Sequence, residues 1–179
     1  MKKILLIASI AFTLLFSLES SAQKFNGLDK SPMDMATFPS SYKISDKIVR
    51  VTYSRPQLKG RSVVQLAPYG EVWRTGANEA TEITFYKEVQ FAGESIAAGT
   101  YALFTIPGEK EWTIILNTKL NQWGAYTYDK DADVARVKVT PKIGDKFLQA
   151  FSMSFNKIEL GATLVMGWGN TRVTVPITL

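Results

Sequence analysis

The segment from position 69 to position 81, YGEVWRTGANEAT, gathers charged, amide and aromatic side chains among glycines and small residues. Its chemistry-bearing residues are Trp73, Arg74, Asn78 and Glu79. A guanidinium presents a planar fork of donors that matches a carboxylate or a phosphate, and an aromatic ring offers an apolar face to a sugar or a cation. The segment therefore has the side chains of a binding site for an anionic or sugar-like ligand.

Two more arginines and two more aromatic residues extend this candidate site. Arg55 and Arg61 lie shortly upstream, and Trp123 and Tyr126 lie downstream in the string NQWGAYTY. Flat aromatic rings suit a carbohydrate, and in a sandwich they would lie at the same end as Trp73. The candidate ligand-binding residues are Arg55, Arg61, Trp73, Arg74, Asn78, Glu79, Trp123 and Tyr126.

The same segment also has a purely structural interpretation. Arg74 would form an ion pair with Glu71 or Glu79 across a compact loop. Trp73 would plug one end of the fold, and Gly76 would supply a backbone angle that other residues do not accept. The downstream aromatic residues would then be ordinary packing. The two interpretations are compatible, because a rigid corner can also carry a ligand.

The chain has no histidine and no cysteine. Their absence removes the usual general base, the usual partner of a nucleophilic serine, the thiolate nucleophile and the commonest zinc ligands. The string YDKDADVAR alternates three aspartates but has Val134 and Thr140 where a calcium loop needs Gly and Glu. We therefore assign no catalytic residue, no metal ligand and no cofactor, and the composition favours a non-enzymatic protein.

Three carboxylates, Glu71, Glu79 and Glu82, leave one enzymatic alternative open. Glycoside hydrolysis uses two carboxyl groups, one to protonate the leaving oxygen and the other as base or nucleophile. Spacing in the sequence does not fix their distance in space, so a carboxylate-dependent glycan hydrolase stays an alternative. A second alternative is a structural or assembly module of the cell envelope that presents a sheet edge to a partner.

Period-two alternation of apolar and polar residues recurs along the chain and indicates the elements that would position these side chains. In KIVRVTYSR, Val49, Val51 and Tyr53 share one face, whereas EWTIILN is apolar on both faces, as in a central strand. The Gly-Asn pair at 169–170 is expected to form a tight turn. About nine short strands predict an all-β domain over 44–179, an antiparallel β-sandwich or jelly roll.

The N-terminus reads MKKILLIASIAFTLLFSLESSAQ, with two lysines, an apolar run and small residues up to Ala22. This pattern predicts a cleaved signal peptide over residues 1–22 and a periplasmic or secreted protein. The apolar run is shorter than the roughly 20 residues that span a bilayer, and no other stretch is long enough. Residues 23–43 contain Pro32 and Pro39 and are expected to form an irregular arm. The net charge of +5 is spread along the chain, which argues against a nucleic-acid partner.

A series of motifs in one order resembles a known family. The motifs are SP at 31–32, YSRP at 53–56, KGR at 59–61, PYGEVWRTGANEAT at 68–81, AAGTYALFTIP at 97–107, WTIILN at 112–117 and WGAYTYD at 123–129. They resemble the exported bacterial family catalogued as domain of unknown function 2911, and they cover essentially the whole mature chain. The resemblance implies a location in the Gram-negative envelope and carries no activity, cofactor or site residue.

These observations predict an exported β-sandwich that binds a small or polymeric ligand, a sugar or a peptide. The prediction rests on the density of polar and aromatic residues in one loop region and on the missing catalytic side chains. Ligand identity, strand order and oligomeric state stay open.

Overall fold

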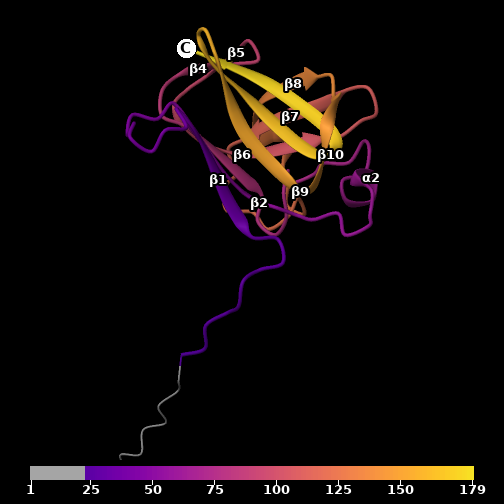
Figure 1. Cartoon of the computed structure of the whole chain (residues 1–179). Helices are drawn as coiled ribbons and strands as arrows, with labels where there is room; N and C mark the ends of the chain where they lie inside the picture. The colour runs from indigo at the N-terminus through magenta and orange to yellow at the C-terminus, as the bar shows by residue number, and fades with distance from the viewer. Residues whose placement is uncertain (1–22) are drawn as a thin grey trace, which may run out of the picture.

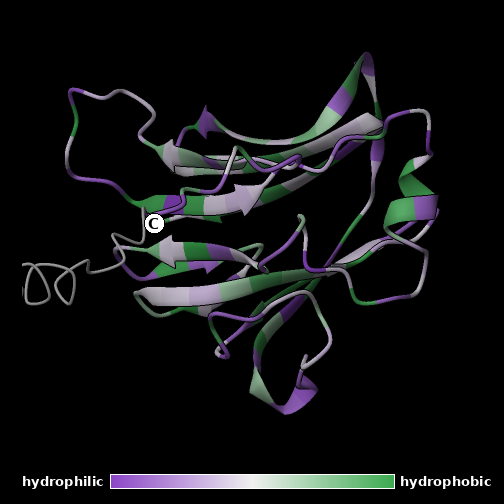
Figure 2. Cartoon of the chain, turned by 90° about the horizontal axis from the view of Figure 1, so that it is seen from below, coloured by the Kyte–Doolittle hydropathy of each residue, from purple (hydrophilic) through white to green (hydrophobic). Residues whose placement is uncertain are grey.

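The computed structural model describes residues 23–179, and the signal peptide predicted over residues 1–22 lies outside them. One antiparallel sheet has six strands in the order β1-β2-β3-β6-β7-β8, and the other has four in the order β5-β4-β10-β9 (Figure 1). Figure 2 shows the two sheets as facing layers. The predicted antiparallel β-sandwich is therefore confirmed.

The strands are short except for the last two, which form a long hairpin. No helix between residues 23 and 179 is long and apolar enough to cross a membrane. The elements are β1 (Met33–Phe38), β2 (Val49–Ser54), α2 (Val63–Leu66), β3 (Thr81–Phe85), β4 (Val89–Phe91), β5 (Glu94–Ile96), β6 (Gly99–Ile106), β7 (Trp112–Asn117), η1 (Lys130–Ala132), β8 (Asp133–Val139), β9 (Lys142–Ile158) and β10 (Gly161–Thr178).

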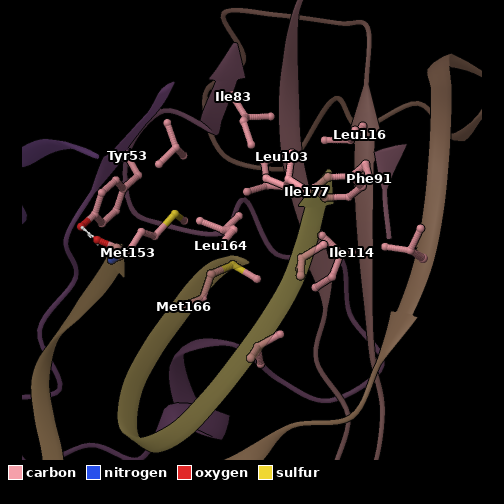
Figure 3. Packing of buried hydrophobic residues seen from close by; sticks show 14 of the residues in the cluster. Tyr53, Ile83, Phe91, Leu103, Ile114, Leu116, Met153, Leu164, Met166 and Ile177 are labelled. Carbon is pink, nitrogen blue, oxygen red and sulfur yellow. Dashed lines mark hydrogen bonds between the residues drawn. The ribbon is translucent and has the colours of Figure 1, made fainter. Parts of the chain in front are cut away.

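The main hydrophobic core lies between the two sheets, where the alternating residues meet. Val49 and Val51 of β2 are fully buried, and Ile177 of β10, in the opposite sheet, belongs to the same cluster. Figure 3 shows apolar side chains of both sheets packed together, with Tyr53 at their side. The Tyr53 hydroxyl accepts a hydrogen bond of 2.8 Å from the backbone N–H of Met153, which joins β2 to β9 across the layers. The predicted inward face of β2 is thus confirmed.

β7 is buried on both faces, as its apolar sequence predicted. Ile114 and Leu116 belong to the main core, whereas Ile115 packs in a smaller cluster with Ala102 and Phe104 of β6. The small cluster lies on the outer face of the six-stranded sheet, because neighbouring residues of a strand point to opposite faces. Loop residues cover it there, among them Val72, Ala80, Leu120, Ala125 and Tyr128. These loops carry the candidate site.

Four aromatic rings close one part of the main core. Trp73 stacks on Trp168 with ring centroids 5.5 Å apart and an interplanar angle of 11°. The edge of Phe151 meets Trp73 at 5.0 Å, and Trp112 lies at 6.3 Å. Aromatic pairs of this kind add about 0.5–1.5 kcal/mol each beyond the burial of their area. The expectation that Trp73 plugs the fold is confirmed.

Two expectations about the elements are corrected. The range 23–43, predicted as an irregular arm, contains β1, which pairs with β2 from Met33↔Ser54 to Phe38↔Val49. Pro32 and Pro39 flank this strand and do not prevent it. Residues 23–32 extend away from the sandwich as an irregular segment (Figure 1). The turn predicted at 169–170 is also wrong, because β10 runs through it. The ten strands agree with the prediction of about nine.

A bulge explains why Gly169 does not make a turn. The register between β10 and β9 shifts on both sides of Gly169, whose φ is 53°. From Gly167 to Thr171 β10 advances four residues while its partner β9 spans nine, from Ser152 to Ile143, so the extra residues lie in β9. Such a bulge bends the paired strands and increases their twist without ending β10. The chain reverses instead at Glu159 and Leu160, between β9 and β10.

Candidate functional site

The segment from Trp73 to Thr81 is an excursion from the sheet. Trp73 exchanges two backbone hydrogen bonds with Thr105 of β6, at 2.7 and 2.9 Å, and Thr81 pairs with Leu103 of the same strand. The Thr81 N–H donates to the Arg74 carbonyl at 3.1 Å, so the two ends of the excursion meet. The residues between them loop out over the outer face of β6 and β7, where they cover the small cluster.

Hydrogen bonds inside the excursion fix its shape. The Trp73 indole N–H donates to the Gly76 carbonyl at 3.1 Å, and the Thr81 hydroxyl donates to the Thr75 carbonyl at 2.8 Å. Thr75 and Asn78 have φ angles of 54° and 60°, values that non-glycine residues rarely adopt. Such backbone strain persists only where the surrounding contacts over-determine it. The excursion is therefore a rigid corner.

Gly76 has a different role from the expected one. Its φ is not positive, so it does not supply a special backbone angle. A Cβ at this position would lie 3.1 Å from the Ser54 carbonyl oxygen and 3.1 Å from the Thr81 hydroxyl. Gly76 is therefore required by the close approach of the excursion to β2.

The second aromatic segment lies beside this corner. The Gly124 N–H donates to the Asn78 carbonyl at 2.9 Å, and the Ala80 N–H donates to the Gln122 carbonyl at 2.8 Å. Glu79 and Trp123 form an antiparallel bridge between these two bonds. The expectation that the two segments meet is confirmed, although their meeting place is the outer face of the six-stranded sheet.

Arg55 and Arg61 both donate to other residues of the chain, Arg55 within the framework of strands and Arg61 within its own surface loop. The Arg55 guanidinium donates to the Phe151 carbonyl at 3.0 Å, to Asp34 at 3.0 Å and to the Ser152 hydroxyl at 2.7 Å. These bonds tie β1 and β2 to β9. Arg61 donates to the carbonyls of its own loop, at Leu58 and Gln57, both at 3.0 Å.

Arg74 differs from both, because no described residue pairs with it. Trp73 and Arg74 are adjacent in an extended row, so the indole enters the core and the guanidinium lies on the opposite side. The predicted ion pair with Glu71 or Glu79 is wrong: within residues 23–179 the Arg74 side chain has neither a salt bridge nor a hydrogen bond. Its Nε is sealed from solvent without a partner.

Arg74 lines a hollow of about 260 Å³. Glu71 and Tyr126 line the same hollow, with Trp73 at its inner side. The Tyr126 side chain is 83% exposed. The apolar lining comes from Leu66, Pro68, Val72 and Ala125. We call this feature the Arg74 hollow.

Gly124 provides the space in which Arg74 and Tyr126 approach each other. A Cβ at position 124 would lie 2.9 Å from the Arg74 Nη1 and 2.7 Å from the Tyr126 Cε2. Its φ of 72° also favours glycine. Sequence reasoning missed this residue, and the only signal for it was a glycine between two aromatic residues of the string NQWGAYTY.

Glu79 lies at a different hollow, of about 230 Å³, together with Glu82, Thr52, Met33 and Asn121. The Glu82 carboxylate accepts a hydrogen bond of 2.9 Å from the Asn121 N–H. We call this feature the Glu79 hollow. Arg74 and Glu79 thus belong to separate hollows, although they are five positions apart.

Asn78 and Trp123 accompany the Glu79 side of the corner. The Ser31 N–H donates to the Asp29 carboxylate at 2.6 Å, and this bond first, then the nearby Asn78 side chain, lower the pKa of Asp29. Trp123 is 59% exposed, and its backbone pairing with Glu79 places the two side chains on one side of the ribbon. The eight candidate residues therefore do not form one pocket.

Comparison with known proteins gives a family and nothing more specific. The sequence pattern of DUF2911, a family described as a protein of unknown function, matches residues 31–177. The chain belongs to the DUF2911 family. No curated protein and no solved structure matches it.

In this DUF2911 chain a polar network anchors the loop that carries Trp123 and Tyr126. Tyr128 donates a 2.6 Å hydrogen bond to Asp133, which also accepts from Arg136 at 2.6 Å and from Asn117 at 2.8 Å. Burial, together with the bond to Asp133, raises the pKa of Tyr128 to about 12, so the phenol stays a donor at neutral pH. The loop is held as firmly as the corner it pairs with.

The aspartates between Asp129 and Asp133 serve this anchoring. Asp129 caps η1 by accepting from the Asp131 N–H at 3.0 Å, and it pairs with Lys119 at 2.6 Å. The bond from Lys119 comes first among the causes that lower the pKa of Asp129. Between Gln23 and Leu179 no group of three acidic side chains is placed to hold a metal ion.

Proposed function

We propose that this DUF2911 protein is an exported, non-enzymatic binding protein that takes a small or polymeric ligand, a sugar or a peptide, at the Arg74 hollow. The observation that carries the proposal is the unpaired guanidinium of Arg74, whose Nε is sealed from water. The predicted signal peptide supports export.

The cost of removing a charged group from water explains why an unpaired, partly buried arginine beside a hollow points to a ligand. A polar group that is removed from water without a partner costs about 1–3 kcal/mol, and more when it is charged. The rest of the fold avoids that cost, since Arg55 and Arg136 are paired. The sealed Nε stays out of reach of a ligand, but a ligand can supply acceptors to the other guanidinium donors of Arg74, for which no described residue supplies any.

The surroundings of Arg74 also favour binding. The corner and the adjoining loop are rigid, so little conformational entropy is lost when a ligand binds. Tyr126 presents an exposed ring beside the guanidinium, and the lining of the hollow is mostly apolar. Binding sites combine an apolar lining with a few placed polar groups in this way.

A thermal-shift screen with oligosaccharides and short peptides tests the proposal. A ligand at 100 times its dissociation constant stabilises the native state by about 2.7 kcal/mol, which raises Tm by about 5–10 °C for a domain of this size. We expect at least one such ligand for the wild type, and a loss of the shift in the double variant Arg74→Met, Tyr126→Ala. A screen in which no compound shifts Tm contradicts the proposal.

One observation supports a second candidate function, the carboxylate-dependent glycan hydrolase. Glu79 and Glu82 line one hollow, and Glu82 is oriented by the Asn121 N–H. Glu71 takes no part, because it lines the Arg74 hollow. Under this alternative Glu79→Gln folds normally and abolishes the release of reducing ends from a polysaccharide panel. Activity retained by that variant, or absent from the wild type, removes the hydrolase.

A further inference from the structure

We infer that the group held by Arg74 is the carboxylate of an acidic sugar, a uronic acid unit. This inference rests on the proposed function and specifies its ligand class. A carboxylate presents two coplanar acceptors that match the paired donors of a guanidinium. The resulting pair of hydrogen bonds is stronger and more directional than a bond to a neutral oxygen. Arg74 is suited to this role because no residue of the described chain uses its donors.

The position of the guanidinium limits how a ligand can approach. Nε is buried, and Nη1 lies beside Gly124, next to the Tyr126 ring. An anion that reaches the exposed edge of Arg74 is therefore held beside an aromatic ring. A pyranose carries its carboxylate on a carbon of the ring, so one unit can contact both Arg74 and Tyr126. The Tyr126 ring would then cover an apolar face of the sugar.

Glu71 distinguishes a uronic acid from other anions. Its carboxylate lines the same hollow and has no salt bridge to a described residue, so it repels a second negative charge and accepts from hydroxyl donors. A uronic acid unit has one carboxylate and several hydroxyl groups. A phosphate monoester brings up to two negative charges at one point, so Glu71 repels it more strongly, and an acidic peptide brings backbone N–H donors without the hydroxyl groups that surround the carboxylate of a pyranose. The combination of Arg74 and Glu71 therefore favours the acidic sugar.

The size of the hollow agrees with a single sugar unit. Its volume of about 260 Å³ lies just below the roughly 300–1,000 Å³ of pockets that enclose a drug-sized ligand. The hollow therefore accommodates one unit, with the rest of an oligomer outside, which suits a polymeric ligand.

Calorimetric titration of the purified protein tests the inference with defined probes. The probes are trimers of galacturonic, glucuronic, mannuronic and guluronic acid, their methyl esters, a neutral galactose trimer and a glutamate tripeptide. We expect at least one uronate trimer to bind, and its methyl ester to bind at least tenfold more weakly, because esterification removes the charge that Arg74 pairs with. The galactose trimer and the peptide should bind at least tenfold more weakly than the uronate.

Matched variants locate the effect. Arg74→Met keeps much of the side-chain length without the charge and should weaken uronate binding at least tenfold. Lys110→Met removes one positive charge from the exposed turn between β6 and β7 and should leave the affinity unchanged. Glu71→Gln should reduce the preference for the uronate over the peptide, because the repulsion of extra carboxylates is lost.

The outcomes separate this inference from the proposed function. Uronate binding that survives esterification or Arg74→Met overturns the inference. Binding of the peptide or of the neutral sugar in place of the uronates also overturns it, while the proposed binding function stands. A wild type that binds no probe here but shows an Arg74-dependent shift with another compound in the thermal screen leaves only the broader function.

Discussion

The Arg55 guanidinium donates hydrogen bonds to Asp34, to Ser152 and to the Phe151 carbonyl, whereas the Arg74 guanidinium donates none to any residue from 23 to 179. Both arginines fall in motifs that resemble the family, and both are partly buried. The first links the two sheets, and the second lies on the outer face of one sheet. The two arginines thus differ in role: Arg55 cross-links the sheets, and Arg74 is an unpaired group beside a hollow.

The difference arises from what surrounds each side chain. Arg55 directly follows β2, where β1 and β9 bring oxygen acceptors from two directions. Arg74 begins an excursion whose own polar groups are already paired with one another. A region that satisfies its polar groups internally leaves an added arginine free. The comparison indicates that stability depends on the framework around Arg55 and Trp73, while the proposed ligand contact would lie at the loops around Arg74.

The largest effect expected from this comparison is at Trp73, the inward neighbour of Arg74. Trp73→Ala removes a ring that contacts Trp112, Phe151 and Trp168, so we expect a loss of about 3–5 kcal/mol in the free energy of unfolding. Urea unfolding measures this loss. Tyr126→Ala is the matched control at an exposed aromatic residue and should stay within about 0.5 kcal/mol of the wild type. A loss below about 1 kcal/mol for Trp73→Ala would mean that the aromatic cluster does not support the corner.

The second effect is at Arg55. Arg55→Met removes the hydrogen bonds to the Phe151 carbonyl, to Asp34 and to the Ser152 hydroxyl and should cost about 1–3 kcal/mol, most of it from these bonds. The ionic part is small, because the side chains of the Arg55–Asp34 pair are 35% and 42% exposed. Urea unfolding again gives the value. Arg61→Met is the control, since Arg61 bonds only to its own exposed loop, and it should change stability by less than about 0.5 kcal/mol. Equal losses for the two variants would contradict the distinction between framework and surface arginines.

The fold was predictable because alternation specifies which residues face a core. Val49, Val51 and Tyr53 were assigned to one face from their spacing, and the structure buries all three. The apolar run of β7 indicated burial on both faces, which the covering loops explain. Alternation does not show where a strand bends, so Gly169 was interpreted as a turn although it lies within β10, opposite a bulge of β9.

The site was predictable in part. The aromatic residues of the two loops predicted that the loops meet. The division of the candidate residues between two hollows was not predictable, because it depends on an excursion that turns within a few residues. The direction of Arg74 depends on Trp73 being held in a row beside Thr105, a contact between distant positions. The role of Gly124 depends on two side chains that approach it in space. Such contacts between distant residues leave no periodic signal in a single sequence.

The smallest effect on stability is expected at Arg74, and its sign is the sharpest test of the comparison. Arg74→Met removes a guanidinium whose Nε is buried, and the substitution breaks no hydrogen bond or ion pair within residues 23–179. Removal of an unsatisfied group is neutral or favourable, so the free energy of unfolding should be unchanged or should rise by up to about 1 kcal/mol. The same substitution at Arg55 has the opposite sign, and measuring both in one urea series cancels the intrinsic effect of exchanging Arg for Met. A loss of 1 kcal/mol or more at Arg74 would show that the framework uses this guanidinium, and the hollow beside it would then be a structural gap with no reason to hold a ligand.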